Sequence, residues 1–230
     1  GLVRTPLTSW PLSWADVVRD LEAVKSVDLR SPSLQDAYDR VRREGRRQTR
    51  VGVVNGHVEM AAAEKPVRVR GFEDLPREDA KLGAGVDWIG ERFAARLQVR
   101  RVWEPEDGKR VRLDGSYAGV AIGNLMVSAG YMEKWWGPGW AGSLILSNNA
   151  RPIPSITIER NQSDPFRAPV LEWLGPWRAS FQAGRLESAR GDFPRAHFIA
   201  LRVAFKPTPS LEIGLSRSAQ LCGRGRDCGL

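Results

Sequence analysis

The feature that most constrains this chain is a series of segments in which apolar and polar residues alternate. The clearest lies between residues 92 and 103, where Phe93 and Leu97 alternate with Arg96 and Gln98. Successive side chains of a β-strand point to opposite faces, so a period of two predicts strands with one apolar and one polar face. Further strands are expected at 50–54, 57–61, 111–122, 125–135, 153–161, 177–187, 195–205 and 211–220. The sequence therefore predicts a mainly β protein.

Most of the expected strands are long. Segments of about 10–12 residues exceed the ~5–6 residues usual in soluble sheets and match the roughly 9–11 with which a tilted strand crosses a bilayer. Tight turns, at Gly123-Asn124 and 206–209, alternate with long connections at 137–152 and 162–175, as periplasmic turns and extracellular loops do. A soluble β-sandwich shares the alternating faces, so the pattern alone leaves both architectures open.

Asn55-Gly56 is expected to form an additional hairpin turn.

A membrane barrel would divide the strand residues between lipid and lumen. The residues expected to face lipid are Phe93, Leu97, Val99, Ile199, Leu201 and Val203, and those expected to face the interior are Arg92, Arg96, Gln98 and Ser180.

The first part of the chain has a helical period instead. Trp14, Val17 and Leu21 recur at helical spacing after a helix-start signal at Ser13, and a second helix is expected from residue 31 to residue 45. One apolar face on each segment predicts a short helical hairpin.

Charge and cysteine usage restrict the possible partners. The chain has 35 Lys+Arg against 27 Asp+Glu, a net charge of +8, which suits nucleic acid, anionic lipid or acidic polysaccharide. Many arginines stand singly at alternate strand positions and do not form a block, so a nucleic-acid partner is not expected. A structural zinc site needs about four N/S ligands, and Cys222 and Cys228 with only the isolated His57 and His197 elsewhere make that reading poor. No metal or cofactor is expected. Cys222 and Cys228 are expected to form a disulfide, with two free thiols as the alternative.

The segment EKWWGPGWAGSLILSNNARP, residues 133–152, is the most informative in the chain. Aromatic rings can stack on sugar C–H surfaces, and amide and guanidinium groups can donate to hydroxyls. The candidate polysaccharide-binding residues are therefore Trp136, Trp140, Asn148, Asn149 and Arg151. The alternative is that the tryptophans pack within the protein or form the aromatic girdle of a barrel.

Several motifs resemble the capsule assembly protein Wzi family. They are WWGPGW and SLILSNNARP, PLTSWPLSWAD at 6–16, LGPW at 174–177 and PSLEIGLSRSAQ at 209–220. The resemblance implies an outer-membrane, antiparallel transmembrane β-barrel, with residues 1–47 as a helical pair at its periplasmic mouth and 48–230 as its strands. Family members are about twice as long, so this chain resembles the N-terminal half, and we expect an open half-barrel.

The resemblance also implies a lectin-like function without catalysis. We expect a protein of the Gram-negative cell outer membrane, surrounded by lipid, that binds capsular or other surface polysaccharide of anionic character. The alternative is a porin or solute channel with an arginine-lined lumen. Strings typical of hydrolases, metalloproteases and nucleotide-binding loops are missing, and a glycosidase pair among Glu133, Glu159 and Glu187 is the weaker reading. No catalytic residues are expected.

Overall fold

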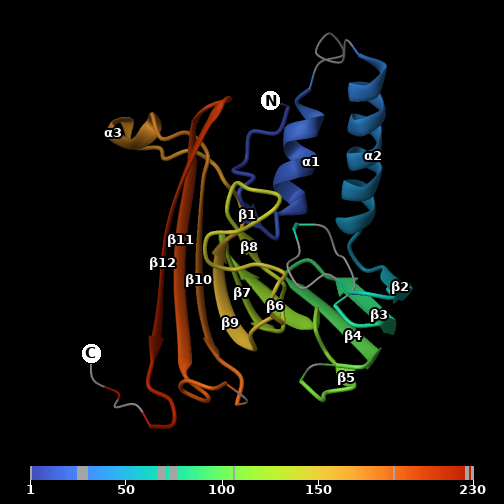
Figure 1. Cartoon of the computed structure of the whole chain (residues 1–230). Coiled ribbons are helices and arrows are strands. Elements are labelled where there is room, and N and C mark those ends of the chain that lie inside the picture. Colours follow the sequence, from blue (N-terminus) through green and yellow to red (C-terminus); the bar gives the residue numbers. More distant parts are fainter. Residues whose placement is uncertain are drawn as a thin grey trace.

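The protein, in a computed structural model, is organised around one antiparallel sheet that curves into an open trough (Figure 1). The structure describes residues 2–24, 31–66, 71–72, 77–105, 107–188, 190–225 and 228. The strands of the sheet are β2 (Val54–Ala62), β3 (Ala80–Ile89), β4 (Phe93–Trp103), β5 (Val111–Arg112), β6 (Tyr117–Ile122), β7 (Leu125–Gly130), β9 (Ser155–Arg160), β10 (Trp177–Arg185), β11 (His197–Thr208) and β12 (Leu211–Leu221).

The strand order places β2 and β12 at the two edges. It runs β2-β3-β4-β6-β7-β9-β10-β11-β12, with β5 paired to β4. Within the described residues the sheet does not close on itself, which confirms the expected mainly β fold and the open half-barrel.

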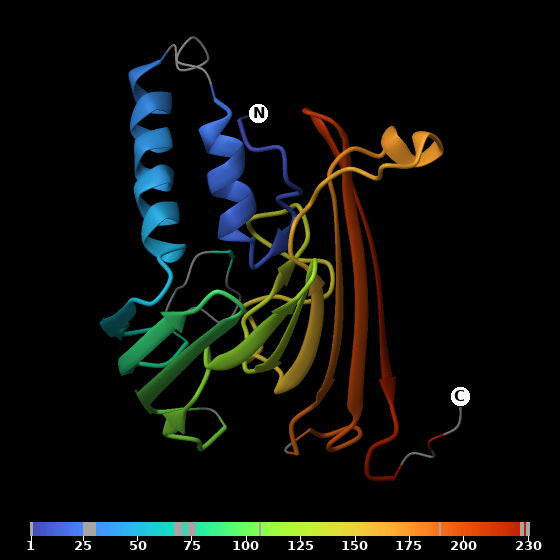
Figure 2. The ribbon, with the colours of Figure 1, turned by 180° about the vertical axis from the view of Figure 1, so that it is seen from behind.

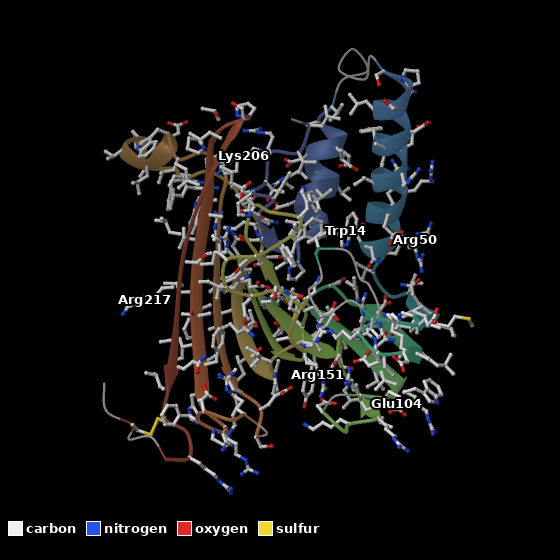
Figure 3. All side chains as sticks on the ribbon, viewed as in Figure 1. Trp14, Arg50, Glu104, Arg151, Lys206 and Arg217 are labelled. Atoms are coloured by element: carbon white, nitrogen blue, oxygen red, sulfur yellow. A yellow bond between two sulfur atoms is a disulfide. The ribbon has the colours of Figure 1, made fainter. Side chains whose placement is uncertain are left out.

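The two faces of the sheet differ in polarity as the sequence predicts. On β4, Leu97 is 55% exposed on the convex face, whereas the next residue, Gln98, is only 2% exposed on the concave face. Leu97 pairs in register with Val86, another exposed apolar residue. Leu201 follows the same rule, but its partner on β12 is Arg217, so one guanidinium lies on the convex face (Figure 3).

The antiparallel pairing sorts the connections into two ends, which we call the helix end and the far end. The helix end holds the tight turns at 90–92, 123–124 and 209–210. The long connection 131–154 leaves β7 and enters β9 on the side of the far end, and between them it runs inside the trough to β1 (Figure 2). The connection 161–176 also lies at the helix end, because β9 runs back from the far end before it. The expected alternation of short and long connections is therefore wrong for this segment.

Several expected strand ends differ from the structure. Asn55-Gly56 is not a turn, because both residues pair with β3 inside β2, and the Asn55 amide donates to Asp87 at 3.2 Å. The expected strand 111–122 is split into β5 and β6 by a turn in which Gly115 has φ +92°. The expected turn at 206–209 lies at 209–210 instead, because β11 continues to Thr208 through a register shift.

Another expected strand, 125–135, is also divided. β7 ends at Gly130, whose φ of +151° suits glycine. The following residues Trp135–Trp136 form β8, which pairs with β1 (Ser9–Trp10) away from the main sheet. The chain therefore leaves the sheet at Gly130 and enters the trough.

Two helices form the expected hairpin at the helix end. They are α1 (Trp14–Glu22) and α2 (Pro32–Gln48), and the Tyr38 hydroxyl of α2 donates to the Leu21 carbonyl of α1 at 3.2 Å. The expected stop at Gly45 is wrong, because the helix continues where a glycine allows close packing: a Cβ there would lie 2.6 Å from Val18 Cγ2. A third, short helix, α3 (Pro169–Glu172), was not expected. No described helix is both long and apolar enough to cross a membrane.

Candidate functional site

Charged and amide side chains on the concave face of β2–β4 bind one another. The Glu59 carboxylate accepts from the Arg100 guanidinium and, at 3.1 Å, from the Gln98 amide, and Lys81 lies 3.7 Å away. The concave face of this part of the sheet is therefore polar and internally paired.

The N-terminal segment crosses the concave face of β10–β12 and is held there by charged side chains. Arg178 donates to the Ser9 carbonyl at 3.0 Å, and Arg202 donates to the hydroxyls of Ser9 and Thr8 at 2.6 Å each. Glu212 accepts from the Thr8 amide at 3.0 Å. These bonds fix β1 inside the trough, where it serves as the partner strand of β8.

Trp136 is the innermost residue of the tryptophan-rich segment. Its side chain has no exposed surface and packs against Phe198 and Ala200 of β11, with Ile145 and Leu146 around it. A side chain without exposed surface cannot stack on a sugar. The expectation that Trp136 contacts polysaccharide is therefore wrong, and the packing alternative holds for this residue.

Trp140, in contrast, is the exposed member of an aromatic cluster. Its ring is edge-to-face with Phe72 at a centroid distance of 4.9 Å, and Phe72 also contacts Trp10 at 4.8 Å and Trp135 at 5.6 Å. The Trp140 residue is 69% exposed. Phe72 thus supports Trp140 from one side and leaves much of the indole open.

A cavity of about 900 Å³ lies at the far end of the trough. The candidates Asn148, Asn149 and Arg151 line it, and Trp140 does not. Asn148 links the two places, because its side-chain amide donates to the Phe72 carbonyl at 3.2 Å while its own carbonyl accepts from Arg77. The structure therefore brings three of the five candidates together at one cavity.

Arg151 is the centre of a charged cluster in the cavity wall (Figure 3). Its Nε and Nη2 form a bidentate pair with Asp114 at 3.0 and 2.7 Å, and its Nη1 donates to Asp107 at 2.7 Å. Arg112 contributes a second guanidinium, which binds Asp107 at 3.0 Å and also pairs with Glu78. Two of the five guanidinium N–H groups of Arg151 are left for a ligand.

The pKa values of this cluster follow from its pairing. Hydrogen bonds to Asp114 and Asp107 outweigh burial and raise the pKa of Arg151. Burial raises the pKa of Asp107, but the Lys109 backbone N–H and the two guanidinium groups outweigh it, so the pKa lies below its ordinary value. Both groups are therefore charged at neutral pH.

The acidic partners were not foreseen from the sequence. Asp107 and Asp114 lie 44 and 37 residues before Arg151, in segments whose composition predicts ordinary turns. The only local signal is the Asp114-Gly115 pair, which marks a turn and not a site.

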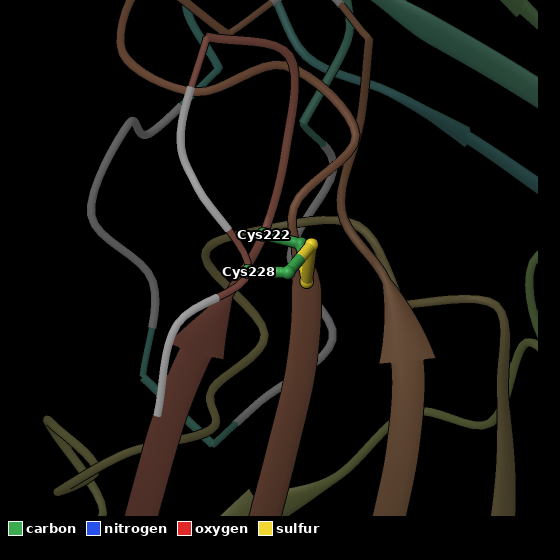
Figure 4. Close-up of a disulfide and its surroundings, with 2 residues drawn as sticks. All are labelled: Cys222 and Cys228. Carbon is green, nitrogen blue, oxygen red and sulfur yellow. A yellow bond between two sulfur atoms is a disulfide. The ribbon is translucent and has the colours of Figure 1, made fainter.

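Cys222 and Cys228 lie just beyond β12 at the far end. The structure joins them in a disulfide with a Cα–Cα distance of 4.4 Å (Figure 4). Among the residues that the structure describes, no cluster of three or more His, Cys, Asp or Glu side chains is arranged to hold a metal ion.

Comparison with known proteins identifies the family. The model of the family described as capsule assembly protein Wzi matches residues 49–230. A Klebsiella pneumoniae protein described as an "uncharacterized 55.8 kDa protein in cps region" is 29% identical over 228 residues, which cover 98% of this chain and 44% of that protein.

A solved structure is similar over nearly the whole chain. It is Wzi, described as an outer membrane protein involved in group 1 capsule assembly in Escherichia coli and as a carbohydrate-binding β-barrel, with a TM-score of 0.84 and 28% identity. The match covers 99% of this chain and 50% of that one, so the chain spans about half the length of the relatives it matches. The resemblance seen in the motifs is confirmed: the chain belongs to the capsule assembly protein Wzi family.

Proposed function

We propose that this protein binds capsular or other surface polysaccharide without catalysis and holds it at the cell surface, as part of an outer-membrane β-barrel. The observation that supports this most directly is the open cavity at the far end, lined by Asn148, Asn149 and Arg151. In this proposal the far end faces outward, and the α1–α2 pair of residues 1–47 lies at the periplasmic mouth.

The chemistry of the cavity suits a glycan. Sugar hydroxyls both donate and accept, and the wall offers carboxylates as acceptors beside amide and guanidinium donors. Trp140 adds an open aromatic face next to this wall. Such a surface binds and orients hydroxyl groups, and Asp107 is unsuited to proton transfer because its hydrogen bonds hold its pKa below the ordinary value.

An anionic glycan is the specific form of the proposal. Lys65 and Arg185 are exposed and line the same cavity, where they can pair with a uronate or phosphate group. Exposed acids such as Glu187 share this wall and would repel an anionic ligand. Binding of an acidic glycan must therefore be compared with binding of a neutral one.

The convex face supports the placement in a lipid bilayer. Its exposed side chains on β4 extend from Phe93 to Trp103, the first and last residues of the strand. Ten residue steps at ~3.4 Å span about 34 Å along the strand, or about 25 Å of height at the usual barrel tilt, which equals the apolar band of an outer-membrane barrel. No nucleic-acid partner is proposed, because arginines of the concave face such as Arg100, Arg178 and Arg202 bind groups within the protein.

A glycan titration of the detergent-purified protein tests the proposal. Trp140→Ala should weaken binding of acidic and neutral glycans alike, by about 2- to 10-fold, because it removes the aromatic face. Arg185→Gln should weaken acidic glycan by about 10- to 100-fold and leave neutral glycan unchanged, since it removes a charge-assisted hydrogen bond. The matched control is Trp173→Ala, which removes a tryptophan of similar exposure, 64% against 69%, from another region.

Two results would contradict the proposal. One is wild-type affinity in both test variants, because the cavity and Trp140 would then have no part in binding. The other is a steady conductance of the wild-type protein in planar bilayers, as expected of a porin.

A further inference from the structure

We propose that the connection 161–176, with α3 at its tip, is an interfacial anchor that lies in the phospholipid headgroup region at the helix end of the barrel. The inference rests on the proposed placement of the convex face in lipid. It adds a lipid-binding segment outside the sheet, and it sets the depth at which the protein sits in the membrane.

The connection 161–176 is held on the convex face by an aromatic stack. Trp177 shares a face of β10 with the exposed Phe181 and is opposite in direction to Arg178, which points into the trough. Phe166 stacks on Trp177 with nearly parallel rings, 4.4 Å between centroids and 7° between planes. The Arg160 guanidinium lies over the same indole at 4.1 Å. The connection is therefore fixed to the outer surface of the strands.

Beyond this stack, α3 projects sideways from the sheet, beside the helix-end tips of β11 and β12 (Figures 1 and 2). Val170 is 81% exposed and Trp173 64% exposed, and Leu171 between them is also exposed. Three neighbouring apolar side chains thus project into the surroundings from a segment of four helical residues and its C-cap.

Exposed aromatic residues also occur elsewhere on the convex face at the helix end. At the helix end of β3 and β4, the exposed residues Trp88 and Phe93 line an apolar hollow with Val51. Aromatic residues gather where barrel strands meet the headgroups, and tryptophan prefers this interface because its ring is amphipathic. α3 also lies at the helix end, and the exposed Arg167 beside it suits anionic phospholipid headgroups.

The exposed apolar surface of α3 is small. The exposed parts of Val170, Leu171 and Trp173 amount to roughly 400 Å², about half of the ~800 Å² that each partner buries in a standard protein interface. The patch is too small to hold a protein partner alone. It is sufficient for a short segment that is already fixed to the barrel and only rests in the interface.

Spin labels in phospholipid vesicles that contain phosphatidylethanolamine and phosphatidylglycerol test the anchor. A label is attached to Val170→Cys, with Leu201→Cys as the reference on the convex face and Lys109→Cys as the reference in a far-end loop; the disulfide-bonded Cys222 and Cys228 do not react. Collisions with oxygen, which concentrates in lipid, are compared with collisions with a water-soluble nickel chelate. We expect the ratio of oxygen to nickel collisions at Val170 to exceed that at Lys109 several-fold and to lie below that at Leu201.

The references separate failure of the anchor from failure of the proposed function. If Leu201 lies in lipid while Val170 resembles Lys109, the anchor is wrong and the barrel placement stands. If Leu201 itself is in water, the placement of the convex face is wrong. If Val170 is shielded from both reagents, protein covers α3, and the lipid anchor is overturned in favour of a protein contact.

Discussion

Placing an arginine at Leu97 would test the assignment of the convex face to lipid. Leu97 lies midway along β4, between Phe93 and Trp103, and it is 55% exposed on the convex face. An arginine at the bilayer midplane costs about 2–4 kcal/mol. At 1.4 kcal/mol per factor of ten, this corresponds to a roughly 30- to 700-fold change in the unfolding equilibrium. Water, in contrast, would solvate the guanidinium at almost no cost.

Two control variants isolate the charge from other effects. Leu97→Ala removes three carbons and costs about 2 kcal/mol in its own right, so Leu97→Arg should be less stable than Leu97→Ala by the further cost of the arginine, about 2–4 kcal/mol. Ser218→Arg places the same charge on the concave face of β12, where the residue is exposed, and should leave stability near that of the wild type. Denaturant titrations in phospholipid vesicles, followed by tryptophan fluorescence, measure all three. Equal stability of Leu97→Arg and Leu97→Ala would refute the lipid-facing assignment.

Two further predictions concern the far end. The pKa of Asp107 is below its ordinary value, so the stability that its carboxylate contributes is complete above about pH 4 and is lost as pH falls through the folded-state pKa. The difference in unfolding free energy between wild type and Asp107→Asn, measured in acid titrations, should therefore shrink at low pH. A difference that grows there would contradict the pairing. Cys222 and Cys228 should resist thiol labelling in the unreduced folded protein, and reduction should cost about 2–3 kcal/mol of stability; rapid labelling of both would exclude the disulfide.

The faces of the strands could be predicted from the sequence because their cause is local. Alternation between Leu97 and Gln98 follows from strand geometry alone, and it survives even where strand ends were misplaced. The ends themselves depend on distant pairing: Asn55-Gly56 has the composition of a turn, yet register with β3 keeps it extended. Local turn preference, worth about 1 kcal/mol or less, yields to a row of ladder hydrogen bonds.

The candidate site was only partly predictable, because partners far apart in sequence decide each role. Trp136 and Trp140 are chemically identical and four residues apart, but Phe198 and Ala200 of β11 pack on the first, while the second stays open. Arg151 was chosen for its donors, and three of its five N–H groups are bound by Asp107 and Asp114. No pattern near either tryptophan or Arg151 shows these contacts.

The excess of positive charge has a structural explanation. This explanation limits what the net charge says about the ligand. Segments that cross the trough leave backbone carbonyls without strand partners, and Lys and Arg supply the missing donors: Arg178 binds the Ser9 and Pro11 carbonyls, and Lys206 binds the Val3 carbonyl at 3.0 Å. A carbonyl consumes a donor without adding a negative charge, so a trough filled by such segments becomes cationic through its own hydrogen bonding. The net charge of +8 is therefore no measure of affinity for anionic glycan. Preference for an acidic ligand depends on exposed cations at the cavity, and this is why Arg185→Gln, and not the overall charge, decides that part of the proposal.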